Sequence, residues 1–173
     1  MTWLDKWLNR GVGYTWELGS FFDLDKERNE NVEKLKALCV KAVNDLQPKD
    51  GKTFCNVAVR GIAGAMGCRH FNDGMLANDM ILEMAKNTAF RLDNGERAQA
   101  HADKGGLAIA AKQAQPHGHV AVIYPMGALY LSGSWKKLVP YVAQVGSHNA
   151  IEPVSKAFPV SEPEPQYFLW GEA

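Results

Sequence analysis

Thr53-Phe-Cys-Asn-Val-Ala-Val59 and, further along, Gly118-His-Val-Ala-Val-Ile123 are the two stretches that decide the fold of this chain. In the first, Cys55 comes directly before apolar residues with helical spacing, which predicts a thiol at a helix start. In the second, His119 opens a β-branched apolar run that predicts a buried strand. A helix N-terminus lowers a thiol pKa and offers N–H groups to an oxyanion, and an imidazole can take the thiol proton. The pair therefore indicates a thiol nucleophile with a histidine base.

Around these two stretches the apolar pattern predicts helices first and strands afterwards. Helices are expected at 31–46, 56–66, 75–86 and 96–103, and strands at 107–111, 119–124, 138–145 and, as a last edge strand, 167–170. Residues 1–10 fit a short amphipathic helix, 21–30 are charged and predicted to be a loop, and the Pro-rich residues 159–165 are predicted to form an extended connector. Helices followed by an antiparallel sheet make an α+β domain.

Size and charge restrict the class of protein. With 173 residues the chain is long enough for one domain with a real core, and 19 basic against 19 acidic residues give no basic footprint for a nucleic acid. No stretch approaches the roughly 20 apolar residues of a membrane span, and residues 1–10 lack the apolar core and cleavage site of a signal peptide. We therefore expect synthesis in the cytoplasm, no membrane span and no nucleic-acid partner. The sequence does not indicate an oligomeric state.

The other cysteines and the histidines have simpler interpretations than Cys55. Cys39, on an apolar helix face, and Cys68, after the second helix, are predicted to be structural, because their spacings form neither a zinc motif nor a disulfide framework. His117 and His119 are two residues apart and define the alternative of a zinc site. A third ligand would then come from another histidine or a carboxylate, and there is no HExxH motif. No cofactor or metal is expected. The remaining histidines that lie in polar surroundings, His70 and His101, are predicted to be on the surface.

Four segments together carry a resemblance to a known superfamily. They are Thr53-Phe-Cys55-Asn-Val-Ala-Val, Met75-Leu-Ala-Asn-Asp-Met, Leu107-Ala-Ile-Ala-Ala and Gly118-His119-Val-Ala-Val-Ile. They resemble the papain-like peptidoglycan amidases and peptidases, above all the CHAP group (cysteine, histidine-dependent amidohydrolases/peptidases) and its NlpC-type relatives. The similarity covers about residues 50–150, with a weaker match at 144–149, and residues 1–30 have no counterpart.

The resemblance implies a papain-like fold, in which the Cys-bearing helix packs on a small antiparallel sheet that carries the His. It implies Cys55 as nucleophile and His119 as base in a metal-independent cleavage of amide bonds in cell-wall peptide stems. These families usually place a polar residue shortly before the Cys to bind the oxyanion, and residues 48–54 contain no Gln or Tyr. The chain would then consist of an N-terminal appendage, residues 1–30, and a hydrolase domain, residues 31–173.

A third residue should orient the imidazole of His119 from the neighbouring antiparallel strand. If Tyr124 pairs near Leu138, His119 lies opposite about position 143, and Gln144 is the nearest polar side chain. A buried amide needs a partner, which is either this imidazole or backbone. Asn149 is the alternative orienter, and His148 comes third.

These observations lead to one main hypothesis and two alternatives. The main one is a cysteine peptidase or amidase acting on bacterial peptidoglycan, as an endopeptidase or an N-acetylmuramoyl-L-alanine amidase, delivered by phage-type release or dedicated export. The first alternative is a non-catalytic structural or binding module on the same scaffold. The second is a papain-like deamidase or transferase that acts on protein.

Overall fold

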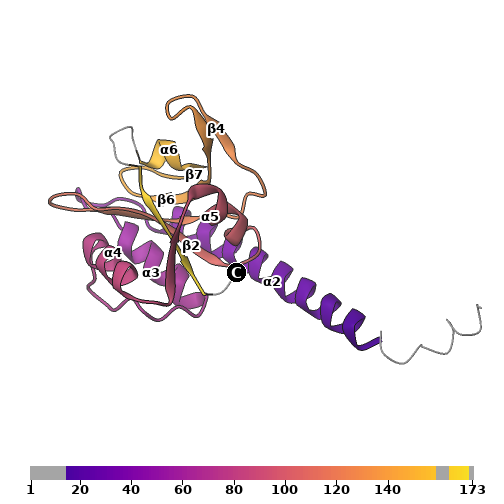
Figure 1. Cartoon of the computed structure of the whole chain (residues 1–173). Helices are drawn as coiled ribbons and strands as arrows, with labels where there is room; N and C mark the ends of the chain where they lie inside the picture. Colours follow the sequence, from indigo (N-terminus) through magenta and orange to yellow (C-terminus); the bar gives the residue numbers. More distant parts are fainter. Residues whose placement is uncertain (1–14, 159–163, 172–173) are drawn as a thin grey trace, which may run out of the picture.

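The chain folds into an α+β structure in which helices cover a six-stranded antiparallel sheet (Figure 1). The computed structural model describes residues 15–158 and 164–171. The helices are α2 (Thr15–Asp45), α3 (Cys55–Ala65), α4 (Ala77–Lys86), α5 (Gly95–Ala102) and α6 (Val154–Ala157). The sheet has the order β1-β8-β2-β3-β6-β7, and its strands are β1 (Phe90–Asp93), β8 (Gln166–Trp170), β2 (Leu107–Lys112), β3 (His119–Ile123), β6 (Tyr141–Val145) and β7 (Asn149–Pro153). A separate hairpin pairs β4 (Tyr130–Ser132) with β5 (Lys137–Val139).

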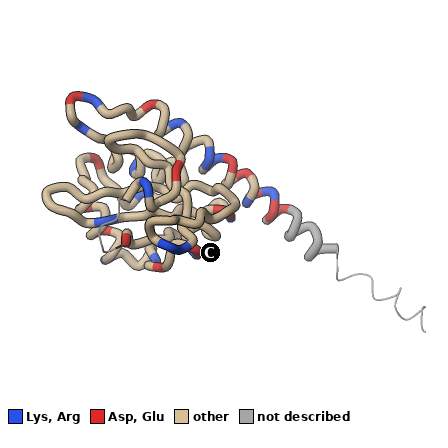
Figure 2. The backbone as a smooth tube through the Cα atoms, turned by 90° about the horizontal axis from the view of Figure 1, so that it is seen from above, with Lys and Arg blue, Asp and Glu red and all other residues tan. Residues whose placement is uncertain are grey.

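Helix α2 is longer than the sequence pattern predicts, and its first half extends away from the domain (Figure 1). The prediction of a loop at 21–30 is wrong, because the helix runs through this segment and through Gly19 and Ser20 without interruption. Oppositely charged side chains one turn apart stabilise it, as in the pair of Lys26 and Glu30. Figure 2 shows these mixed charges along the protruding part of the helix. The expected helix at 1–10 lies outside the described residues.

The second half of α2 is anchored in the core. Leu35 and Cys39 are fully buried, whereas Leu24 is 61% exposed. The helix approaches the turn after α5 so closely that a Cβ on Gly105 would lie 2.7 Å from the Cβ of Asn31. Gly105 also has a positive φ of 82°, so both its backbone and its surroundings favour glycine.

The sheet differs from the predicted one in the division of one strand, the place of another and the presence of two unpredicted edge strands. The segment expected as one strand, 138–145, is divided at Pro140 into β5 and β6, which belong to different sheets. The expected edge strand, β8, lies inside the sheet between β1 and β2. Tyr167, Phe168 and Leu169, which alternate between the two faces of the sheet, are all buried, and this explains why this short strand is so apolar. The edges are β1 and β7, neither of which was predicted.

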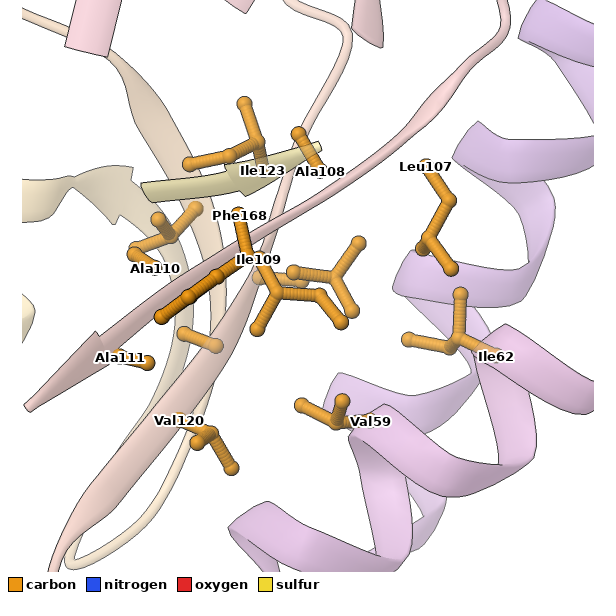
Figure 3. Close-up of a cluster of buried hydrophobic side chains, with 14 of the residues drawn as sticks. Val59, Ile62, Leu107, Ala108, Ile109, Ala110, Ala111, Val120, Ile123 and Phe168 are labelled. Atoms are coloured by element: carbon orange, nitrogen blue, oxygen red, sulfur yellow. The ribbon is translucent and has the colours of Figure 1, made fainter. Parts of the chain in front are cut away.

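The core lies between the central strands and the helix that begins at Cys55. Alternate residues of β2, Leu107 and Ile109, point toward Val59 and Ile62 of α3 (Figure 3). Val120 of β3 lies in the same cluster. All five side chains are at least 97% buried, so the start of β3 is held firmly against α3.

A second anchor fixes the hairpin formed by β3 and β6 at its far end. The amide N–H of Tyr124 donates to the carbonyl of Tyr141. The buried side chain of Gln99 replaces the second bond of this pair: its Nε2 donates to the Tyr124 carbonyl, and its Oε1 accepts from the Tyr141 amide, both at 2.9 Å. Gln99 therefore determines which residues of β3 and β6 face each other.

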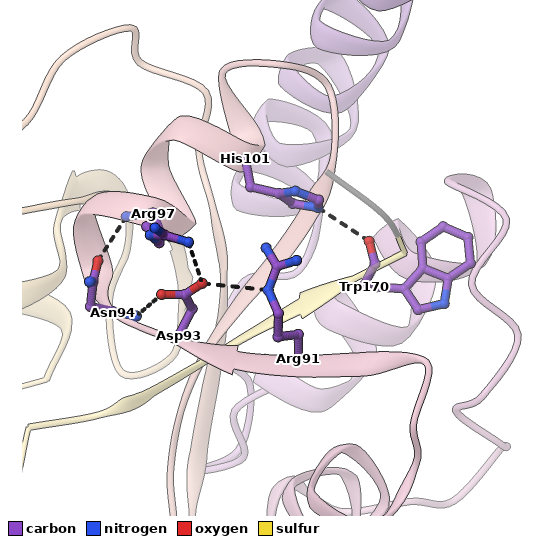
Figure 4. A network of polar contacts seen from close by, with 6 residues as sticks. All are labelled: Arg91, Asp93, Asn94, Arg97, His101 and Trp170. Carbon is purple, nitrogen blue, oxygen red and sulfur yellow. Dashed lines mark hydrogen bonds and ion pairs between the residues drawn. The ribbon is translucent and has the colours of Figure 1, made fainter.

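A polar network joins β1, α5 and the end of β8 (Figure 4). Asn94 caps α5 by accepting from the amide of Arg97, and Asp93 forms ion pairs with Arg91 and Arg97. Beside it, the prediction that His101 lies on the surface is wrong: this residue is 5% exposed, and its Nε2 donates to the Trp170 carbonyl at 3.2 Å. Burial lowers the pKa of His101 and keeps the ring neutral.

Within the described part of the chain, no helix combines the length and apolar character that crossing a membrane requires.

Candidate functional site

Cys55 is the first residue of α3, as the sequence predicts, and its side chain is 8% exposed. Burial raises the pKa of this thiol, and the backbone N–H groups of Val120, Asn56 and Cys55 itself oppose the rise by hydrogen bonding. Val120 directly follows His119 in β3. The thiol therefore lies against the start of the strand that carries the histidine. The other two cysteines, Cys39 and Cys68, are buried and free, as expected of core residues.

The imidazole of His119 is bound to a buried side chain of the next strand. Its Nε2 lies 2.7 Å from Oε1 of Gln144, which is only 4% exposed. An amide oxygen only accepts, so Nε2 carries a proton and donates it. In a neutral ring the other nitrogen, Nδ1, then has a free lone pair and can accept a proton.

The register that brings these two side chains together differs from the predicted one. Val122 pairs with Ala143, so extending the ladder places Gly146, not position 143, opposite His119. The predicted register is wrong because the loop after Tyr124 contains the β4–β5 hairpin, and β3 and β6 meet at Tyr141 instead of Leu138. Gln144 falls opposite Ala121, which shares a face with His119, two residues away along β3. It therefore reaches the imidazole diagonally.

An aromatic ring, which the sequence analysis did not single out, covers the imidazole. The centroid of the Phe158 ring lies 4.8 Å from that of His119, and the planes are inclined by 49°. Phe158 is 2% exposed, and its amide donates to the carbonyl of Val154 in α6. Burial lowers the pKa of His119, the hydrogen bond to Gln144 opposes this, and the nearby His148 lowers it further. A phenylalanine after a short helix gives no signal in the sequence that could have revealed this contact.

The two alternative orienters have other partners. The Nδ2 of Asn149 donates to the carbonyls of Val43 and Leu46 at the end of α2, both at 3.0 Å, and its Oδ1 accepts from the Gly146 amide at 3.1 Å. His148 is largely exposed and pairs with Glu152 at 2.7 Å. Both residues are near His119 in the fold, but the contact with its Nε2 is made by Gln144.

Two side-chain amides hold the loops beside Cys55 and His119. Nδ2 of Asn56, the residue after the thiol, donates to the carbonyl of Met75 at 2.8 Å. Nδ2 of Asn78 donates to the carbonyl of Ala114 at 2.9 Å, across 36 residues. A Cβ on Gly118 would lie 2.3 Å from Oδ1 of Asn78, so the chain can pass here only without a side chain. The loop that leads into His119 is thereby fixed to the start of α4.

The structure gives the zinc alternative no third ligand among the residues it describes. No group of three or more His, Cys, Asp or Glu side chains in this part of the chain could hold a metal ion. His117 lies exposed in the loop before β3, while His119 is half-buried and bound to an amide.

Comparisons with protein-family models and with curated proteins found no match for this chain.

Proposed function

We propose that this protein is a metal-independent cysteine hydrolase, with Cys55 as nucleophile, His119 as base and Gln144 as the residue that orients the base. One observation carries the proposal: the helix that begins at the thiol packs against the strand that begins at His119, and Nε2 of this histidine is held by a buried amide. A nucleophile, a base and a residue that orients the base are what nucleophilic catalysis needs.

The direction of the two pKa shifts indicates how the thiol is activated. Burial raises the pKa of Cys55 and lowers that of His119, so both shifts favour a neutral thiol beside a neutral imidazole. We infer general-base activation: Nδ1 of His119 takes the proton as the sulfur attacks the carbonyl carbon. The imidazolium then gives this proton to the leaving amine, which leaves a thioester with Cys55. A water molecule, deprotonated by His119, hydrolyses the thioester and restores the thiol.

The charge that develops on the substrate oxygen needs donors. The first amides of an α-helix have no acceptor within the helix, and α3 begins at Cys55. The backbone amide of Cys55 is therefore one candidate donor. The described residues just before it, 48–54, supply neither Gln nor Tyr as a second one. We propose that oxyanion binding relies mainly on backbone groups at this helix start.

For the substrate we propose amide bonds of bacterial peptidoglycan, because the segments around Cys55 and His119 resemble the CHAP and NlpC-type enzymes. Supporting features are the helix with the cysteine and the antiparallel sheet with the histidine, which is the arrangement that a papain-like fold requires. The proposed site of action is the cell wall, reached by phage-type release or dedicated export.

The alternative of a non-catalytic module has one observation in its favour. A thiol whose pKa is raised by burial is less reactive than an exposed one. Iodoacetamide labelling of Cys55 over a range of pH separates the two proposals. In an enzyme, the imidazole of His119 takes the thiol proton and accelerates labelling, and His119→Ala abolishes this acceleration.

Digestion of purified peptidoglycan tests the proposed function directly. We expect soluble fragments whose masses identify the cleaved bond: a free L-alanine amino group marks an amidase, and a shortened or opened stem peptide marks an endopeptidase. The matched controls are Cys55→Ala, which should release nothing, and Cys39→Ala, which should release the same fragments. A folded wild-type protein that releases no fragment from any peptidoglycan type would refute the substrate.

A further inference from the structure

Gly146 lies beside the proposed base, His119, and beside Gln144, the residue proposed to orient it. It follows β6, and the ladder places it opposite His119. A Cβ at this position would lie 2.7 Å from Nε2 of Gln144 and 3.7 Å from Cε1 of His119. The first distance is too short for any real contact, so an added methyl group must displace the amide.

The backbone of Gly146 is itself held in place. Its amide donates to Oδ1 of Asn149, whose Nδ2 is bound to two carbonyls at the end of α2. The glycine therefore cannot move away freely from an added side chain. Gly146 is not among the residues with positive φ, so alanine meets no left-handed backbone strain here. The consequence of the substitution thus falls on the Gln144 amide.

We propose that Gly146 is a positioning residue: its lack of a side chain lets Gln144 reach Nε2 of His119. Asn149 holds the Gly146 backbone beside the Gln144 amide by accepting a hydrogen bond from the Gly146 N–H. This inference rests on the proposed function for its meaning in catalysis. The geometric part is independent of the substrate, because it concerns the protonation and orientation of one imidazole.

The test is a double-mutant cycle between Gly146→Ala and Gln144→Ala, with two measurements on each protein. One is the pH dependence of iodoacetamide labelling at Cys55, and the other is the NMR titration of His119. Hydrolysis of peptidoglycan is measured in addition for every variant if the wild-type protein shows it. In the wild-type background we expect Gly146→Ala to slow labelling by about tenfold at neutral pH, the size of a lost hydrogen bond to an ionised group. In the Gln144→Ala background the same substitution should change the rate less than twofold, because the amide it displaces is gone. Gly133→Ala is the matched control, since a Cβ there meets nothing within 4 Å.

The cycle distinguishes the inference from a general loss of structure. Equal effects of Gly146→Ala in both backgrounds, or an unchanged His119 titration, would overturn it. If Gly146→Ala alone fails to fold, the double variant decides: recovery of folding shows the collision with Gln144, and failure to recover refutes it. An absence of hydrolysis with the expected cycle in labelling and titration would instead reject the peptidoglycan substrate and leave the positioning role intact.

Discussion

Replacing Gln144 with alanine is the substitution that most directly probes the proposed site. It removes the buried acceptor that lies 2.7 Å from Nε2 of His119 and leaves this N–H without its partner. The base keeps its place in β3 but loses what fixes its tautomer and its plane. The proposed nucleophile, Cys55, is untouched. We therefore expect a reduced rate and not an inactive protein.

The magnitude follows from the kind of hydrogen bond. When His119 takes the thiol proton, the ring becomes positively charged, and a bond to an ionised group contributes about 1.5–3 kcal/mol. If Gln144→Ala loses this contribution only in the transition state, in which the ring is charged, kcat falls by roughly 10- to 100-fold. His119→Ala should cost more, because it removes the base itself. Gln144→Glu keeps an acceptor at the same reach and should raise the pKa of His119, since a carboxylate favours the imidazolium.

Steady-state hydrolysis, iodoacetamide labelling and the NMR titration of His119 measure these effects together. The matched variant is Asn149→Ala, which removes three hydrogen bonds of about 1 kcal/mol each and should lower the free energy of unfolding more than Gln144→Ala does. Its rate should fall less, because Asn149 acts on the site only through Gly146. An unchanged rate for Gln144→Ala, together with a crippled Asn149→Ala, would refute this assignment of the orienter.

Four further predictions follow from single features. Cys55→Ala should abolish hydrolysis in a folded protein, whereas Cys39→Ala and Cys68→Ala should stay active; turnover by the first variant would end the nucleophile role. Activity should survive EDTA and be lost to iodoacetamide; loss on chelation with rescue by zinc would favour the metal alternative. Phe158→Ala should raise the pKa of the imidazole that it covers, measured by NMR, and Phe158→Leu should do so less, because burial by an apolar side chain is what lowers it. The free energy of unfolding should fall as the pH drops from the usual histidine pKa of 6.5 toward the lowered pKa of His101, because the unfolded chain binds more protons in this range. Denaturant titrations at several pH values measure this slope, and His101→Gln should flatten it.

Local patterns in the sequence predict the elements that carry the site. The apolar spacing after Cys55 and the β-branched run after His119 are dense and bounded by turn residues, so both elements begin where expected. The same reasoning fails for residues 21–30, where mixed charges without Pro or Gly form a solvated part of helix α2 and not a loop. It also misses β1 and β7, because edge strands of mixed polarity have no continuous apolar run.

Relations across the sheet depend on packing that the sequence does not display. The pairing of β3 with β6 is set at Tyr124 and Tyr141 by the side chain of Gln99, which comes from α5. The loop between the strands contains a hairpin of its own, so counting residues across it gives a register that is wrong by three positions. Gln144 is nevertheless the residue in contact with His119, because it is the polar residue of an otherwise apolar strand.

The contacts around His119 explain why such a short strand can hold this imidazole in place. One edge of the ring is bound to Gln144, one face is covered by Phe158, and Gly146 leaves the room in which the amide lies. Each contact comes from a segment that is itself fixed elsewhere: Gly146 through Asn149 to the end of α2, and Phe158 through its amide to α6. Because α2 also packs on α3, the elements that carry the imidazole and the thiol share one support.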